Sequence, residues 1–258
     1  KSSVDTIERI KHYLDSAGRF GNTPFIYPVF GLGGILQSAV NKSTAFDAKC
    51  EFSQKIVSID YGSDGKVSGV TTAKKKFLAN TIICNPQMAL ALELKGKARE
   101  IARVVRCVCI LEHTISGTKD ASSASIILPL KVTGRRGDIY INMVSSIHHV
   151  AKPGYYIATV TTLFEPPSHE VLAQKSPQDY YYSYLAPALD LLQPISHKFA
   201  WVSPMYEGYS DSPVDNLYIT RGVDPTPTFN SLAHEIVWLC RKVGIGEIDL
   251  DKLGDIGD

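Results

Sequence analysis

The 258-residue sequence has no long apolar run and almost no net charge. No apolar stretch approaches the roughly 20 residues that a helix needs to span a bilayer, so the sequence predicts a soluble protein. Lysine and arginine total 27 against 26 acidic residues, and a net charge of +1 gives no field that would attract nucleic acid or an anionic membrane. With 44% apolar and 21% charged residues, the composition is typical of a globular protein with a sizeable core.

Cysteine is scarce, and its five positions are scattered along the chain. Cys107 and Cys109 lie two apart on an apolar stretch that predicts a strand, so their side chains should point to the same face. No second pair of ligands accompanies them to complete a metal site. We therefore expect buried structural thiols in a reducing cytosol, and no bound metal.

The sequence also lacks an arrangement of catalytic residues. Ser145-Ser146 does not match the nucleophile pattern G-x-S-x-G. His148-His149 follows a predicted strand, and adjacent strand residues face opposite ways, so the pair cannot easily share a metal ion. We expect these histidines to flank a turn, and the sequence predicts neither catalytic residues nor an enzyme.

Residues 25–60 have the pattern strand, glycine turn, helix, strand, which is typical of a βαβ unit. An aromatic segment at 25–30 would form the first strand, 35–46 the helix and 50–59 the second strand. Glycines at this kind of turn let a phosphate approach the helix. The dinucleotide fingerprint needs a third glycine where Leu36 stands, however, so we expect no nucleotide or other cofactor here.

The rest of the chain predicts a mixture of helices and antiparallel strands, and hence a mixed α/β (α+β) fold. Apolar residues at spacings of three and four predict an amphipathic helix at 4–16. Because the polar residues at 1–3 lead directly into this helix, we expect the sequence to be an internal fragment of a longer chain. Hairpins are expected between residues 61 and 84. Further strands are expected at 104–111, 125–130, 139–144 and 155–163, and helices at 180–192 and 230–243.

The segment at 18–37 reads GRFGNTPFIYPVFGLGGILQ. It resembles YGKSPYLYPLYGLGELPQ, a block shared by Rab GDP dissociation inhibitors and Rab escort proteins. Shorter matches follow along nearly the whole chain, but only to the C-terminal part of the family. They are GKVSGV at 65–70, IICNP at 82–86, CILEH at 109–113, DIYINMVS at 138–145 and PALDLLQPI at 187–195.

The resemblance implies a fold related to FAD-linked oxidoreductases, without a flavin. Such proteins bind GDP-loaded, prenylated Rab GTPases, extract them from membranes and keep them soluble in the cytoplasm, touching the membrane only transiently through this cargo. Residues 1–20 would be a remnant of the small helical domain that shelters the lipid. Residues 21–258 would be the C-terminal part of the large domain that carries the Rab-binding platform.

The resemblance also implies which residues contact the Rab. The platform segment of the family, GELPQGFARLSAIYGGTYM, falls on residues 33–51, of which Gln37 and Ser43 match. The candidate Rab-binding residues are Tyr27, Gly33, Gly34, Gln37, Asn41, Lys49 and Glu51.

Four of these candidates depart from the family pattern. The family's Glu falls on Gly34, its Arg on Asn41, its Thr on Lys49 and its Met on Glu51. Each lost charge-assisted contact costs about 1.5–3 kcal/mol. The departures therefore predict a weaker platform than the family's.

Two alternatives remain open at this stage. The sequence of residues 18–25 favours an escort protein that presents Rab to geranylgeranyl transferase. The matches at 109–113 and 138–145 favour the dissociation inhibitor. A flavin-dependent oxidoreductase without its N-terminus is the alternative from a different class of protein.

Overall fold

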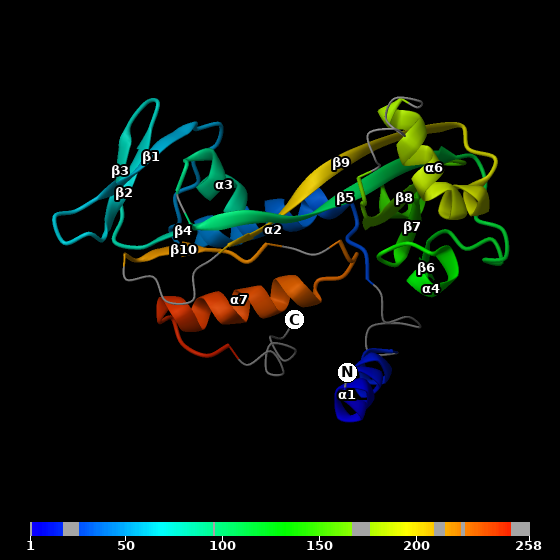
Figure 1. Ribbon diagram of the computed structural model, residues 1–258, viewed down its shortest axis with the longest axis horizontal. Helices are drawn as coiled ribbons and strands as arrows, with labels where there is room; N and C mark the ends of the chain where they lie inside the picture. Colours follow the sequence, from blue (N-terminus) through cyan, green and yellow to red (C-terminus); the bar gives the residue numbers. More distant parts are fainter. Residues whose placement is uncertain are drawn as a thin grey trace.

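The computed structural model describes residues 2–17, 26–94, 96–166, 176–208, 215–222 and 225–248. These residues form a mixed α/β structure in which two long strands, β5 and β9, run between two smaller assemblies (Figure 1). The helices are α1 (Ser3–Ser16), α2 (Leu32–Ala45), α3 (Pro86–Ala91), α4 (Leu130–Thr133), α6 (Pro177–Leu189), α7 (Asn230–Val243) and the 3-10 turns η1 (Ser146–His148) and η2 (Asp190–Leu192). The strands are β1 (Ile56–Tyr61), β2 (Val67–Thr72), β3 (Lys76–Leu78), β4 (Ile82–Cys84), β5 (Ala98–Leu111), β6 (Ala124–Leu128), β7 (Ile139–Ser145), β8 (Tyr156–Leu163), β9 (His197–Gly208) and β10 (Leu217–Ile219).

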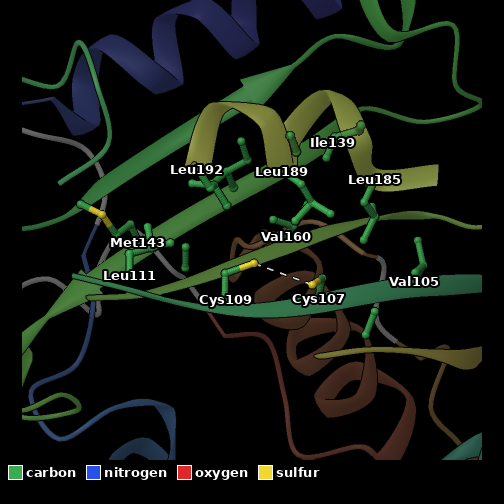
Figure 2. Packing of buried hydrophobic residues seen from close by; sticks show 14 of the residues in the cluster. Val105, Cys107, Cys109, Leu111, Ile139, Met143, Val160, Leu185, Leu189 and Leu192 are labelled. Carbon is green, nitrogen blue, oxygen red and sulfur yellow. Dashed lines mark hydrogen bonds between the residues drawn. The ribbon is translucent and has the colours of Figure 1, made fainter. Parts of the chain in front are cut away.

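The largest sheet is antiparallel and has the strand order β6-β7-β8-β5-β9. Burial alternates along its central strands, because successive side chains point to opposite faces. The buried face is covered by α6 and η2 (Figure 2). The antiparallel sheet predicted from the apolar segments is therefore confirmed.

The main core lies between this sheet and α6. Leu185 and Leu189 of α6 and Leu192 of η2 point toward the sheet, where Val160 and the two cysteines lie (Figure 2). Cys107 and Cys109 are fully buried, with 3.7 Å between their sulfur atoms. Their contact, together with burial, raises the pKa of the Cys109 thiol. Both side chains lie in the core, as expected of buried structural thiols.

A second, smaller core joins the ends of several elements. Strands β10 and β4 pair in parallel, and their side chains pack against Val67 and Ala89. Asp215, just before β10, ties this region together: its carboxylate accepts a hydrogen bond from the Lys97 ammonium at 2.8 Å, and its backbone oxygen accepts one from the Val67 N–H. The side chains of Asp215 and Lys97 are 19% and 29% exposed, so solvent screens this pair less than a surface pair.

We expect Asp215→Asn to lower the free energy of unfolding at neutral pH by about 1–3 kcal/mol, because a charge-assisted hydrogen bond is lost. Burial alone would raise the pKa of Asp215, but the hydrogen bonds from Lys97 and from the Leu217 N–H lower it overall. A lowered pKa in the folded state stabilises the fold above the unfolded-state pKa, and this contribution is lost as the pH falls through the folded-state value. Urea titrations should therefore show the free energies of unfolding of the variant and the unmodified protein converging at acidic pH.

Glu207→Gln is the control, because it removes the more exposed ion pair with Arg99. It should lower the free energy of unfolding by under ~1 kcal/mol. Equal losses for both variants would contradict this account.

The third sheet, β1-β2-β3, is an antiparallel meander with the strand order of the chain. Gly69 allows its middle and last strands to approach, since an added Cβ would collide with the carbonyl oxygen of Phe77. These strands confirm the predicted hairpins between residues 61 and 84.

The βαβ unit expected at residues 25–60 is only partly present: its helix forms, its first strand does not, and its second strand begins later than expected. Residues 26–31 form no strand: Pro28 has no N–H to donate to a ladder, and the Gly31 N–H closes a turn onto the Pro28 carbonyl at 3.0 Å. The following strand begins only at Ile56 and pairs antiparallel with β2. Among the described residues, α2 is thus preceded by a turn, and no parallel strand pair flanks it.

Two features of the sequence cannot be compared with the structure. The domain boundary predicted at residue 20 and the segment 18–25 lie outside the described residues. In the part of the chain that the structure describes, no helix is long and apolar enough to cross a membrane.

Candidate partner-binding face

Helix α2 carries four of the seven candidate residues on one side. Gly33, Gly34, Gln37 and Asn41 follow a spacing of three and four, which places them on a single face of the helix. The Gln37 amide donates a hydrogen bond to the Asn41 side-chain oxygen at 2.9 Å. The two glycines add no side chains, so the first turn is a bare backbone surface and the second and third turns present amides. We call this set of four residues the polar face of α2.

The opposite side of α2 is apolar and also uncovered. Leu32 and Leu36 are 56% and 71% exposed, and Ile35 is exposed as well. Within the described residues no residue of α2 except Gly34 and Val40 is even half-buried. The helix therefore separates two surfaces, an apolar one of the kind that normally packs inside a protein and a polar one of the kind that normally faces a partner or solvent.

The remaining three candidates lie off the helix. Tyr27 precedes α2 and is 37% exposed, with its ring packed edge-on against the ring of His148. Lys49 and Glu51 follow the helix, beyond a left-handed turn at Asp47, and both are exposed. Glu51 forms an ion pair with Lys75 at the β2–β3 turn. The structure thus brings four candidates together on α2, places Tyr27 at its start, and directs Glu51 toward the meander.

The start of α2 has a feature that sequence reasoning missed. Phe30 has a left-handed backbone, with φ of 69°, although its side chain is bulky and 72% exposed. Such a conformation costs on the order of 1–3 kcal/mol for a non-glycine residue and persists only where the surroundings impose it. The ring of Phe30 is stacked on that of His149, with 4.9 Å between the centroids. No local signal in the sequence points to this pair, because its members lie far apart along the chain.

A separate hollow of about 310 Å³ lies beside α7, between the end of β9 and the residues after β10. Glu235 lines it, is 9% exposed and accepts a hydrogen bond from the Arg221 N–H at 2.7 Å. The guanidinium of Arg221 lies over the ring of Trp238. None of the seven candidate residues lines this hollow, and no described group of three metal-binding side chains occurs here or elsewhere.

The chain shares its fold with an oxidoreductase and with a flavin-dependent halogenase. An oxidoreductase from Methanosarcina mazei superposes with a TM-score of 0.53 at 14% identity, covering 74% of this chain and 49% of the other. The flavin-dependent halogenase BrvH from Brevundimonas superposes with a TM-score of 0.51 at 14% identity, covering 83% of this chain and 41% of the halogenase. At such identity the likeness is one of fold alone, and it confirms the fold class predicted from the sequence.

A much stronger likeness identifies the family. Residues 1–254 match the family model described as GDI, GDP dissociation inhibitor. The structure of a Rab GDI from Plasmodium falciparum superposes with a TM-score of 0.83 at 31% identity, covering 95% of this chain and 52% of the other. A probable secretory pathway GDP dissociation inhibitor from Schizosaccharomyces pombe is 34% identical over 236 residues, which is 92% of this chain and 50% of that protein. Rab GDP dissociation inhibitor beta from Canis lupus familiaris is 32% identical over 249 residues, which is 96% of this chain and 52% of that protein.

The chain belongs to the GDP dissociation inhibitor family, as the resemblance of its motifs predicted. It spans about half the length of the curated relatives that it matches.

Proposed function

We propose that this protein binds GDP-loaded, prenylated Rab GTPases, slows their release of GDP and recycles them between membrane and cytosol. The observation that carries the proposal is the family match over residues 1–254, with relatives named as Rab GDP dissociation inhibitors. The open polar face of α2 supports it, because that face offers amide groups and exposed backbone to a partner. Binding of this kind is surface recognition, and the protein acts as a regulator without a catalytic step.

The proposed contact runs along α2. Gln37 and Asn41 would donate and accept hydrogen bonds, while Gly33 and Gly34 would let the partner approach the helix backbone. Tyr27 would contact the partner at the start of the helix. Lys49 and Glu51 would lie at the far end of the contact, where the Glu51 carboxylate is already held by Lys75.

The domain assignment is likewise a proposal. Helix α1 exposes its whole apolar side, with Val4, Ile7 and Leu14 each more than 60% exposed. A helix with such a side normally packs against other helices, which supports placing residues 1–20 in the small helical domain and residues 21–258 in the large domain. The protein would then work in the cytoplasm and meet the membrane only through its Rab cargo.

A dissociation inhibitor is favoured over an escort protein, because the relatives named above are inhibitors. The residues that favoured the escort protein, 18–25, lie outside the described residues. The flavin-dependent alternative has only the distant likeness of fold to a flavin-dependent halogenase in its favour. Absorbance spectra of the purified protein test it, since a bound flavin would colour the protein yellow.

Calorimetric titration with prenylated Rab tests the proposed function. We expect the GDP-loaded form to bind at least roughly a hundredfold more tightly than the GTP-loaded form, a difference of about 2.7 kcal/mol. Release of a fluorescent GDP analogue from Rab should slow in proportion to the fraction of Rab bound. Equal affinity for the two nucleotide forms, or no binding of either, would refute the proposal.

A further inference from the structure

The start of α2 is held by a turn that lies more than a hundred residues further along the chain. This turn, residues 146–150, comprises η1, His149 and Val150, and we call it the histidine bracket. The Phe30 N–H donates a hydrogen bond to the His148 carbonyl oxygen at 2.9 Å. The rings of Phe30 and His149 are stacked with an angle of 21° between their planes. A backbone contact and a ring contact therefore fix the same residue.

Two further contacts extend the bracket to either side of Phe30. The rings of Tyr27 and His148 meet edge to face, with 5.3 Å between centroids and 89° between planes. Gly31 lies so close to Val150 that an added Cβ would come within 3.1 Å of a methyl group of that residue. The segment before α2 is thus seated on the bracket at three successive points.

The bracket itself is anchored in the large sheet. It follows directly from Ser145, which is buried at the end of β7 and is paired with Tyr156 of β8. Inside the turn the His149 N–H donates to the Ser146 carbonyl oxygen at 2.9 Å, and the Ser145 N–H donates to Nδ1 of His148 at 3.4 Å. The sheet therefore fixes the position of the bracket, and the contacts with Phe30 fix the start of α2 relative to the bracket.

The contacts between Phe30 and the histidine bracket are energetically important, because both stacked residues have unfavourable backbone conformations. Phe30 and His149 both have left-handed backbones, with φ of 69° and 53°. Phe30 is largely exposed, so burial of its side chain does not offset the cost of its backbone conformation. The ring stacking on His149 and the hydrogen bond from the Phe30 N–H are the contacts that offset this cost.

We propose that the histidine bracket is a positioning element that sets the direction in which α2 presents its polar face. His149 acts through Phe30, and His148 acts through Tyr27 and the Phe30 backbone, without touching the partner. The consequence for partner binding rests on the proposed function, whereas the consequence for the order of α2 does not.

Two substitutions of His149 separate ring stacking from backbone preference. His149→Asn keeps a residue that tolerates a left-handed backbone but removes the ring, whereas His149→Phe keeps a ring in a residue that favours this backbone less. Loss of an aromatic contact of this kind corresponds to about a two- to tenfold change in an equilibrium constant. We expect His149→Asn to speed amide hydrogen exchange at the start of α2, at the hydrogen-bonded N–H groups of Phe30 and Gly34, by up to roughly tenfold and to weaken binding of GDP-loaded, prenylated Rab by a similar factor. His149→Phe should stay within about twofold of the unmodified protein in both measurements.

Lys152→Ala is the matched control, because Lys152 lies in the same β7–β8 connection but contacts Tyr155. It should change neither measurement. A purely local role of His149 in its own turn predicts the reverse order, with His149→Phe the more damaging variant, and that order would overturn the proposal. If the unmodified protein binds no Rab, the proposed function fails, while the exchange of α2 amides still decides whether the bracket positions the helix.

Discussion

Replacing Gly34 by glutamate and Asn41 by arginine together is expected to tighten binding of GDP-loaded Rab by at least roughly a hundredfold. These are the two positions at which the family pattern has a charged residue and this chain has none. Each charge-assisted hydrogen bond contributes about 1.5–3 kcal/mol, and each 1.4 kcal/mol is a factor of about ten in affinity. The gain should be lost as the salt concentration rises, because exposed charges are screened.

The structure has room for both side chains. An added Cβ at Gly34 would lie 3.5 Å from the Val29 carbonyl oxygen, which is an ordinary contact. The Asn41 side chain accepts an exposed hydrogen bond from the Gln37 amide one turn earlier in the same helix. The two positions are seven residues apart, so the new side chains would lie two turns from each other on the polar face. Replacing a glycine inside a helix also stabilises the helix itself by roughly 1 kcal/mol.

Leu36→Glu with Ser43→Arg is the control for this pair. It introduces the same two charges at the same spacing, but on the apolar side of α2, where Leu36 is 71% exposed. Titrations of both double variants against GDP-loaded Rab should show a gain only for the pair on the polar face. An equal gain in both would mean that charge alone attracts the Rab, and no gain in either would exclude the polar face as the docking surface.

Apolar spacing and turn residues within a short stretch of sequence account for most of the helices and strands that were predicted correctly. The helix predicted at 230–243 has those bounds in α7, because its apolar spacing is regular and Gly244 adopts the left-handed conformation that ends a helix, with φ of 81°. Strands β6, β7 and β8 of the large sheet were also predicted within a few residues, whereas β5 begins six residues before the strand predicted at 104–111. In each case the signal lies within a few residues of the element that it defines.

The errors arise where contacts between distant parts of the chain decide the conformation. The aromatic residues at 26–30 have the composition of a strand, yet Phe30 packs on His149 and the segment forms a turn. The same limit applies to the candidate site. The motif resemblance supplied the candidate residues, but it could not predict that Glu51 pairs with Lys75 or that the histidine bracket contacts Tyr27.

Two adjacent leucines give the sharpest test of the core. Leu192 of η2 is fully buried in the core between α6 and the large sheet, whereas its neighbour Leu191 is 45% exposed. We expect Leu192→Ala to lower the free energy of unfolding by about 2–5 kcal/mol, because it removes buried methyl groups and leaves a cavity. Leu191→Ala makes the same chemical change at the surface and should cost under ~1 kcal/mol.

Urea unfolding monitored by circular dichroism measures both variants under the same conditions. A large shift of the midpoint for Leu192→Ala alone would confirm that the sheet and α6 share one tightly packed core (Figure 2). Similar shifts for the two variants would mean that η2 is not packed as described. Because β7 belongs to this core and leads directly into the histidine bracket, Leu192→Ala should also speed amide exchange at the start of α2. Stability of the sheet would then be linked to the geometry of the face that we propose binds Rab.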